Sequence, residues 1–275
     1  MQFSRIPFPS KPQQTDPPYM DAYLLDTVEA NPYFSARPAV VICPGGGYEF
    51  VSEREGEAVA MRFLAAGFHA FVLQYSVAPA RFPTALCELA YAVQTVRQHA
   101  AEWKIEENRI YVMGFSAGGH LAASLGTLWN DPLLERALGY GAGPKPWKPD
   151  GMLLCYPVLT LGAFTHEGSR DSLLGPDAPQ EKIAALSLET RVDASTVPAF
   201  IWHTENDGAV PVENSLQFAA ALRKAGVSFE LHIYQYGPHG ISLCDKTTSY
   251  EEKQLVPDAA GWMDLAIRWI TRQQA

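Results

Sequence analysis

Short apolar runs alternate with longer stretches of helical periodicity along most of this 275-residue chain. The runs are almost uninterrupted aliphatic and aromatic sequences, a pattern typical of parallel strands that are covered on both faces. They span Ala39–Cys43, Ala70–Tyr75, Ile110–Gly114, Met152–Tyr156, Phe200–His203 and Phe229–Tyr234, with Ala22–Leu25 as a candidate outer strand. Strands that alternate with helices predict an α/β fold: a doubly wound, mostly parallel β-sheet with helices on both faces.

The stretches between these runs carry helix signals. Ser52–Glu55 has the residue types of a capping box, and the amphipathic run behind it stops at Gly67. Thr84–Trp103 repeats apolar residues at helical spacing. Asn214–Lys224 and Pro257–Thr271 are the other clear predicted helices.

Hydrophobic residues make up 47% of the sequence, which is enough to bury one large core. We therefore expect residues 1–275 to form a single domain, interrupted by two long stretches that break the alternation. Loops of this length within a compact domain are usually functional. We expect residues 160–198 to form a small cap insertion over the functional site, and Trp129–Pro149 to form part of its rim.

The formal net charge of −9 at pH 7 makes nucleic acid and anionic membrane surfaces unfavourable partners. The N-terminal residues lack the apolar core of a signal peptide, and no apolar stretch reaches the length of a membrane span. The cysteines have no C-x-x-C spacing, so we expect free thiols in a reducing compartment and a cytoplasmic protein. They are Cys43, Cys87, Cys155 and Cys244.

Gly114-Phe115-Ser116-Ala117-Gly118 connects a predicted strand to a predicted helix. A turn that lifts the Ser116 hydroxyl clear of the sheet is so tight that side chains at positions 114 and 118 would collide, so glycine is needed at both. The N–H group of Ala117 would lie at the helix N-terminus, where backbone dipoles favour negative charge. The pattern predicts a nucleophilic serine; an ordinary glycine-rich turn is the alternative.

A second glycine-rich segment, Cys43–Tyr48, follows the first central strand. Its successive glycines Gly45, Gly46 and Gly47 let the backbone approach a ligand and direct N–H groups toward a developing oxyanion. Open α/β sheets bind ligands at the carboxyl ends of their strands, where this loop and the serine turn both lie. We expect the loop to supply oxyanion donors; a plain connection after a strand is the alternative.

A histidine in the right place for a general base is His239, in a short loop flanked by glycine and proline directly after the last predicted strand. The preceding strand is followed by Glu205 and Asp207. We favour Asp207 as the acid because its Asp-Gly turn would fix the carboxylate. His166, in the predicted cap, is a candidate substrate contact. The remaining histidines are expected to be structural: His69, His99, His120, His203 and His232.

These motifs together resemble those of α/β-hydrolases of the acetyl esterase/lipase group, which includes acetylxylan-esterase-like and hormone-sensitive-lipase-like enzymes. The resemblance rests on PGGGY at 44–48, GFSAGGHLA at 114–122, WHTENDGAVPVENSL at 202–216 and YGPHGISL at 236–243, with weaker support from the run at 169–175. It implies that Ser116 is the nucleophile, Asp207 the acid and His239 the base. It also implies oxyanion donors at Gly46, Gly47 and Ala117.

One departure from that group affects the oxyanion loop. Pro44 stands where many members have a histidine before the glycines, so the choice of donors among Gly45, Gly46 and Gly47 stays open. Other residues that could reach the site are Arg54 and Glu55, although the capping role already accounts for Glu55. Candidate aromatic residues for the pocket are Tyr48, Phe50, Trp129, Trp147 and Phe164.

The hypothesis is a serine carboxylesterase that acts on a small-molecule ester, with short acyl groups and acetylated carbohydrates as the substrates that the resemblance suggests. No metal or organic cofactor is expected, because no cluster of His, Cys and Asp has ligand spacing. The same triad also cleaves amides and thioesters, so a serine peptidase or thioesterase is an alternative. A non-catalytic receptor on a hydrolase scaffold is another. Acyl-chain length, the alcohol portion and the oligomeric state are open.

Overall fold

A computed structural model describes residues 1–9, 17–27, 35–141 and 143–273, and these contribute an eight-stranded sheet of order β1-β2-β4-β3-β5-β6-β7-β8. Its strands are β1 Gln2–Pro7, β2 Tyr19–Leu24, β3 Arg37–Cys43, β4 His69–Gln74, β5 Ile105–Phe115, β6 Gly151–Cys155, β7 Ala199–Thr204 and β8 Phe229–Tyr234. β1 and β2 pair antiparallel and β2 pairs antiparallel with β4, whereas the remaining pairs are parallel. The predicted mostly parallel sheet is confirmed, and every run proposed as a strand forms one.

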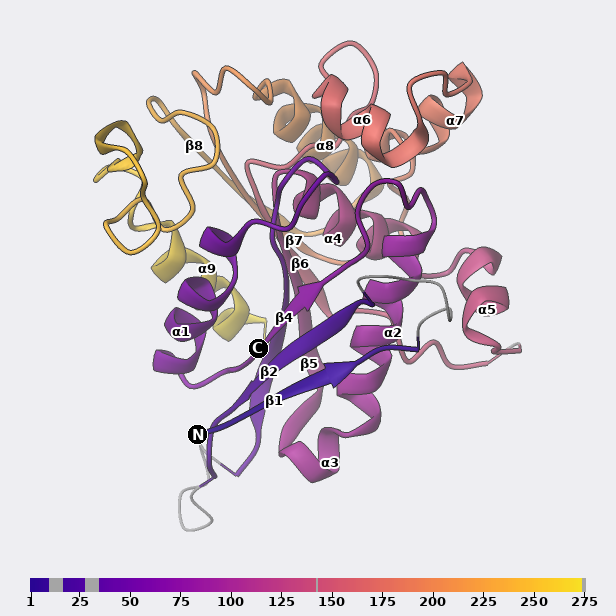
Figure 1. The fold of residues 1–275 in the computed structure, drawn as a ribbon, viewed down its shortest axis with the longest axis vertical. Coiled ribbons are helices and arrows are strands. Elements are labelled where there is room, and N and C mark those ends of the chain that lie inside the picture. Colours follow the sequence, from indigo (N-terminus) through magenta and orange to yellow (C-terminus); the bar gives the residue numbers. More distant parts are fainter. Residues whose placement is uncertain (10–16, 28–34, 142, 274–275) are drawn as a thin grey trace.

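The two faces of the sheet are covered by different helices (Figure 1). The helices are α1 Glu57–Ala65, α2 Thr84–Gln98, α3 Ala100–Trp103, α4 Ala117–Leu128, α5 Pro132–Leu138, α6 Glu167–Leu174, α7 Gln180–Ala185, α8 Glu213–Ala225 and α9 Trp262–Arg272. α1 and α9 pack on one face, and α2, α4 and α8 on the other. Within β3, Val40 and Ile42 face the first group and Val41 the second. This burial on both sides explains why the central strands are apolar at every position.

Strand β1 was not predicted. It pairs only with β2 at the edge of the sheet, and most of its side chains are exposed. An edge strand of this kind needs no apolar run, so its sequence lacks the signal that identified the central strands. Residues 10–16, in the middle of the proline-rich N-terminal stretch, lie outside the described residues.

The predicted capping box at Ser52–Glu55 is wrong. Ser52 makes no side-chain capping bond, Glu53–Glu55 forms a short 3-10 turn, and α1 begins only after Gly56. The carboxyl group of Glu55 instead accepts hydrogen bonds from the Gly45 N–H and the Tyr156 hydroxyl. The other predicted helices form, with Thr84–Trp103 divided into α2 and α3 and the last one starting later than predicted, at Trp262.

The expectation that residues 129–149 form part of the rim of the site is also wrong. Arg97 of α2 donates hydrogen bonds to the carbonyls of Pro146 and Lys148. Asp150, which directly precedes the first residue of β6, accepts the N–H of Ile110 in the middle of β5. Ser116, in contrast, follows the carboxyl end of β5. The 12 residues of α4 carry the chain back by about 18 Å, which places this segment at the opposite edge of the sheet.

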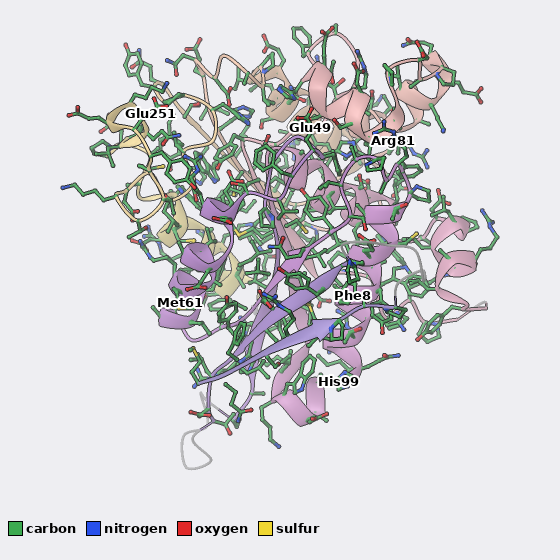
Figure 2. All side chains as sticks on the ribbon, in the orientation of Figure 1. Phe8, Glu49, Met61, Arg81, His99 and Glu251 are labelled. Atoms are coloured by element: carbon green, nitrogen blue, oxygen red, sulfur yellow. The ribbon has the colours of Figure 1, made fainter. Side chains whose placement is uncertain are left out.

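The segment predicted as a cap, residues 160–198, holds α6 and α7 above the carboxyl ends of the strands (Figure 1). The Ser172 hydroxyl of α6 donates to the carboxyl of Glu49, which follows the glycine loop, at 3.3 Å. The Arg81 guanidinium donates to the Ser172 carbonyl. Glu49 and Arg81 lie beneath this segment in Figure 2. These contacts place α6 over the glycine loop; the role of the segment as a cap stays a prediction.

Candidate active site

Ser116 lies at the sharp turn between β5 and α4 with φ 52° and ψ −117°, a backbone conformation that residues other than glycine rarely adopt. Its backbone is fixed from both sides. The Ser116 N–H donates to the Cys155 carbonyl at 3.0 Å, and the Ser116 carbonyl accepts the N–H of Val158 at 3.0 Å. The strained turn is therefore held by the neighbouring strand β6 and the residues that follow it.

The glycines on either side of this serine are required by the backbone itself. A Cβ atom on Gly114 would overlap the carbonyl oxygen of Gly118, and a Cβ atom on Gly118 would overlap the carbonyl oxygen of Cys43. Both obstacles are main-chain atoms, which a rotamer change cannot remove. The collision expected from the sequence at these positions is present.

The structure brings Ser116, His239 and Asp207 together at the carboxyl edge of the sheet. His239 Nε2 is 2.8 Å from Ser116 Oγ, and His239 Nδ1 is 2.7 Å from Asp207 Oδ2. If the serine hydroxyl donates to Nε2, then Nδ1 carries the ring proton and donates it to the carboxylate. Glu205, the alternative acid, has an exposed side chain, and its backbone N–H donates to the Tyr234 carbonyl.

The Asp207 side chain is buried, yet the pKa of its carboxyl is lowered well below its ordinary value. Burial alone would raise this pKa, but hydrogen bonds from His203 and His239 outweigh it, and the N–H of Val210 adds to them. The N–H groups of Ala209 and Val210 both donate to Oδ1 at 2.9 Å. The carboxyl therefore stays ionised beside the imidazole over the whole physiological pH range.

His203 is a partner of this carboxylate that sequence reasoning missed. It was expected to be a packed histidine, and it is fully buried at the end of β7. Its Nε2 lies 3.3 Å from Asp207 Oδ2 and 3.0 Å from the Val210 carbonyl, while Nδ1 lies 2.8 Å from the Ser215 hydroxyl. The only signal in the sequence was its position four residues before Asp207.

In the glycine loop, the N–H of Gly45 is already bound to the Glu55 carboxyl at 2.8 Å. Gly46 and Gly47 have positive φ values of 120° and 67°, which glycine adopts more easily than other residues do. Within the described part of the chain, the N–H groups of Gly46, Gly47 and Ala117 have no protein acceptor. The sequence left open which of the three glycines donate to an oxyanion. The N–H of Gly45 is the one that is already bound within the protein, to Glu55.

A buried pair connects this loop to the helix behind the serine. The Tyr48 hydroxyl is 3.0 Å from His120 Nδ1, and His120 Nε2 is 3.0 Å from the Leu186 carbonyl. Since a carbonyl only accepts, Nε2 carries the proton and the tyrosine donates to Nδ1. Burial lowers the pKa of His120 to about 4, so the ring is neutral at pH 7. This agrees with the structural role expected for His120.

The other candidate residues divide between the site and the rest of the molecule. Phe50 and Phe164 are exposed beside the glycine loop and α6, whereas Tyr48 is buried. Trp147 is buried at the opposite edge, where its indole N–H donates to the Trp129 carbonyl.

His166 accepts the N–H of Ser169 at the start of α6. The pKa of His166 is lowered by burial and then by the charge of His239. The four cysteines are free, as predicted. No group of three or more His, Cys, Asp or Glu residues within the described ranges is arranged to hold a metal ion. No helix in those ranges is both long and apolar enough to cross a bilayer.

Comparison with known families and curated proteins gives consistent matches. The model of the BD-FAE family matches residues 25–222. Endo-1,4-beta-xylanase B of Butyrivibrio fibrisolvens is 38% identical over 215 residues, covering 76% of this chain and 33% of that protein. Acetylxylan esterase of Xylanibacter ruminicola is 29% identical over 231 residues, covering 82% of this chain and 45% of that protein. The chain thus spans between a third and a half of these relatives.

Solved structures match over nearly the whole chain. The acetyl ester-xyloside bifunctional hydrolase from Caldicellulosiruptor lactoaceticus has a TM-score of 0.83 and 36% identity, covering 98% of this chain and 96% of that one. The carboxylesterase Cest-2923 from Lactobacillus plantarum has a TM-score of 0.86 and 29% identity, covering 100% and 98%. The shared architecture is the α/β-hydrolase fold, as the sequence motifs implied.

Proposed function

The chain belongs to the BD-FAE family of α/β-hydrolases, and from this premise we propose that it is a serine carboxylesterase acting on short-chain acyl esters. The observation that carries the proposal is the unbroken line of contacts from Ser116 Oγ through the His239 imidazole to Asp207, at 2.8 and 2.7 Å. This is the arrangement that activates a serine hydroxyl for attack on an acyl carbon.

In the first half of the reaction, Ser116 Oγ attacks the ester carbonyl carbon while His239 Nε2 takes the hydroxyl proton. Asp207 keeps the ring in the tautomer with Nδ1–H and stabilises the imidazolium that forms, without taking the proton itself. The tetrahedral intermediate then expels the alcohol, to which His239 returns the proton. The acyl group remains bonded to Ser116 Oγ.

The negative charge of the tetrahedral oxygen needs donors that are already in place. The N–H groups of Gly46, Gly47 and Ala117 are the proposed donors, since they follow the strand ends beside Ser116 and have no protein acceptor within the described residues. Preorganised N–H groups stabilise such an oxyanion without further rearrangement, and each is worth about 3 kcal/mol of transition-state stabilisation. Ala117 also benefits from the N-terminal end of the α4 dipole.

In the second half, a water molecule replaces the alcohol. His239 Nε2 removes its proton as the water oxygen attacks the acyl carbon. The second intermediate then collapses, the bond from the acyl carbon to Ser116 Oγ breaks, and His239 returns the proton to Oγ as the carboxylic acid leaves.

The preference for small acyl groups, with acetylated carbohydrates as the foremost class, is supported by the names of the relatives, an acetylxylan esterase and an acetyl ester-xyloside hydrolase among them. A position of α6 directly over the glycine loop is compatible with a short acyl group. A receptor without catalysis is disfavoured because all three side chains stand in bonding geometry. No observation favours a peptidase or a thioesterase.

Hydrolysis of p-nitrophenyl acetate by the wild type and the Ser116→Ala variant tests the proposal. We expect the variant to fold and to lose turnover by at least about 10⁴-fold. A fluorophosphonate probe should label the wild type on Ser116 and leave the variant unlabelled. Full hydrolysis by the alanine variant would refute the assignment. A panel of acetyl, butyryl and longer esters, with acetylated xylo-oligosaccharides, then tests the substrate class.

A further inference from the structure

Glu55 is a buried acidic residue that the catalytic steps above do not use. It is only 3% exposed, and both of its carboxyl oxygens accept hydrogen bonds: Oε2 from the Gly45 N–H at 2.8 Å and Oε1 from the Tyr156 hydroxyl at 2.6 Å. Two accepting oxygens are the pattern of a carboxylate. A Cβ atom on Gly45 would lie 2.8 Å from Glu55 Oε2 and 3.2 Å from the Ser116 Cβ, so this glycine fills the gap between them.

The second contact of Glu55 leads to the loop that carries His239. The Tyr156 hydroxyl, which donates to Glu55, accepts the N–H of Ser242 at 2.9 Å. Tyr156 also packs edge-on against the His239 ring, with centroids 5.1 Å apart and an interplanar angle of 73°. A single carboxylate therefore connects the glycine loop to the segment three residues after His239.

The neighbouring residue holds the same segment from another direction. The Arg54 guanidinium donates to the carbonyl of Gly240, the residue next to His239. The Arg54 carbonyl accepts the Ser242 hydroxyl at 2.9 Å, and the guanidinium stacks over the Tyr250 ring at 4.8 Å. Arg54 and Glu55 thus contact the glycine loop and the His239 loop, which are about two hundred residues apart in sequence.

We propose that Arg54 and Glu55 are positioning residues that hold the oxyanion donors and the general base at a fixed mutual geometry. The inference rests on the proposed function, because it concerns how that site is kept in register. Glu55 takes the first N–H of the glycine loop, which leaves the next two for substrate, and Tyr156 transmits the same anchor to the His239 loop. Charge-assisted bonds of this kind are shorter and stronger than neutral ones.

A carboxylate near the oxyanion site also carries a cost, because it repels the charge that develops in the transition state. Its presence beside the glycine loop is favourable overall if the geometry that it enforces outweighs that repulsion. The two effects have opposite signs in a Glu55→Gln variant, which removes the charge and keeps the shape. If positioning dominates, the variant is slower than the wild type; if repulsion dominates, it is faster.

The first test compares Glu55→Gln with Glu88→Gln. Glu88 is a matched control, because its carboxyl also bridges a backbone N–H and a hydroxyl, both of Ser76, at 2.7 and 2.6 Å. Each kcat is divided by the concentration of sites that a fluorophosphonate labels, so that unfolded protein does not count. We expect Glu55→Gln to lower kcat by roughly 10- to 100-fold with KM changed less than about threefold, and Glu88→Gln to leave both near wild type.

The second test distinguishes an effect on the His239 loop from an effect on the glycine loop by comparing substrates with different leaving groups. Expulsion of an alkoxide needs the proton from His239, whereas p-nitrophenolate leaves without it. Tyr156→Phe releases the His239 loop and keeps the Gly45 contact, so it should slow hydrolysis of an alkyl acetate about tenfold more than that of p-nitrophenyl acetate. Tyr23→Phe is its control, since Tyr23 also bonds a carboxyl, that of Glu57 at 3.3 Å, away from both loops.

Arg54→Met keeps most of the side-chain length and provides a variant in which the buried carboxylate is untouched. It should share the selective loss on alkyl acetates. The proposal is overturned if Glu55→Gln equals or exceeds wild-type kcat per labelled site, or if Tyr156→Phe and Arg54→Met match the Tyr23→Phe control on both substrates. Failure of the esterase assignment looks different: Ser116→Ala would then retain activity or the wild type would not be labelled.

Discussion

The turn at Ser116 and the loops of Asp207 and His239 meet at one edge of the sheet, but they are held there in different ways. Around Ser116 a steric constraint is added to the two main-chain hydrogen bonds: Gly114 and Gly118 are packed against main-chain atoms, which leave no room for a side chain. Around His239 the constraint is a set of hydrogen bonds. Thr204 donates to the Gly237 carbonyl, and the Gly237 N–H donates to the Asn206 side chain. The first region should respond to changes of volume and the second to changes of single polar atoms.

The largest effect is expected from a change of one atom on the hydrogen-bonded side. Asp207→Asn preserves the shape but presents the wrong partner to the His239 ring, so kcat should fall by about 10⁴-fold. The Glu205→Gln variant is the control, because that neighbouring carboxyl is exposed. The measurement is kcat for hydrolysis of p-nitrophenyl acetate. An equal loss of kcat in both variants would show that Asp207 is not the acid.

A change of volume on the serine side should unfold the protein instead. Gly118→Ala places a methyl group against the Cys43 carbonyl, and we expect a loss of more than about 4 kcal/mol in the free energy of unfolding. Gly261→Ala is the matched control, because that glycine has φ −75° and nothing within 4 Å of an added Cβ. A stable but inactive Gly118→Ala protein, measured by urea unfolding, would contradict the steric view.

His120 tests whether the serine side also depends on hydrogen bonds. Its pKa is lowered from 6.5 to about 4 by burial, so the unfolded chain takes up a proton first as the pH falls. Stability should therefore be lost between pH 6.5 and about 4, by on the order of 3 kcal/mol from this residue. His120→Gln should reduce this pH dependence of urea unfolding relative to the wild type. An unchanged profile in His120→Gln would place the acid sensitivity elsewhere.

The smallest effect is expected from a change at His203, the second histidine that contacts the Asp207 carboxylate. His203→Phe keeps a ring and removes its donor, which should raise the pKa of Asp207, lower stability by about 1–3 kcal/mol and lower kcat roughly tenfold. His99→Phe is the control, since His99 stacks on Trp103 far from the site. A variant with normal kcat would limit His203 to a packing role.

The parts of this molecule that sequence reasoning identified are those whose constraint is local. Central strands such as β3 are apolar at every position because both faces are covered, and that pattern can be recognised without neighbours. The serine turn carries its steric requirement within five residues. The loop of His239 was located because it follows the last strand of a known topology.

The parts that were missed depend on partners distant in the chain. Glu55 has the spacing of a capping box, and only the folded structure places Gly45 and Tyr156 beside its carboxyl. His203 differs from an ordinary buried histidine only by what lies next to its Nε2. Residues 129–149 contain turn-forming residues of the kind found near sites, but the length of α4 decides at which edge they lie.

The direction of the first and last elements has a practical consequence. β1 runs parallel to β4 through β2, so Gln2 lies at the amino edge of the sheet, and α9 ends near Gly151, the first residue of β6, against which Trp269 packs. The start of β1 and the end of α9 therefore both lie toward the edge of the sheet opposite Ser116 (Figure 1). An affinity tag, a tether to a solid support or a carbohydrate-binding module joined before β1 or after α9 would thus start at the far edge of the sheet from Ser116.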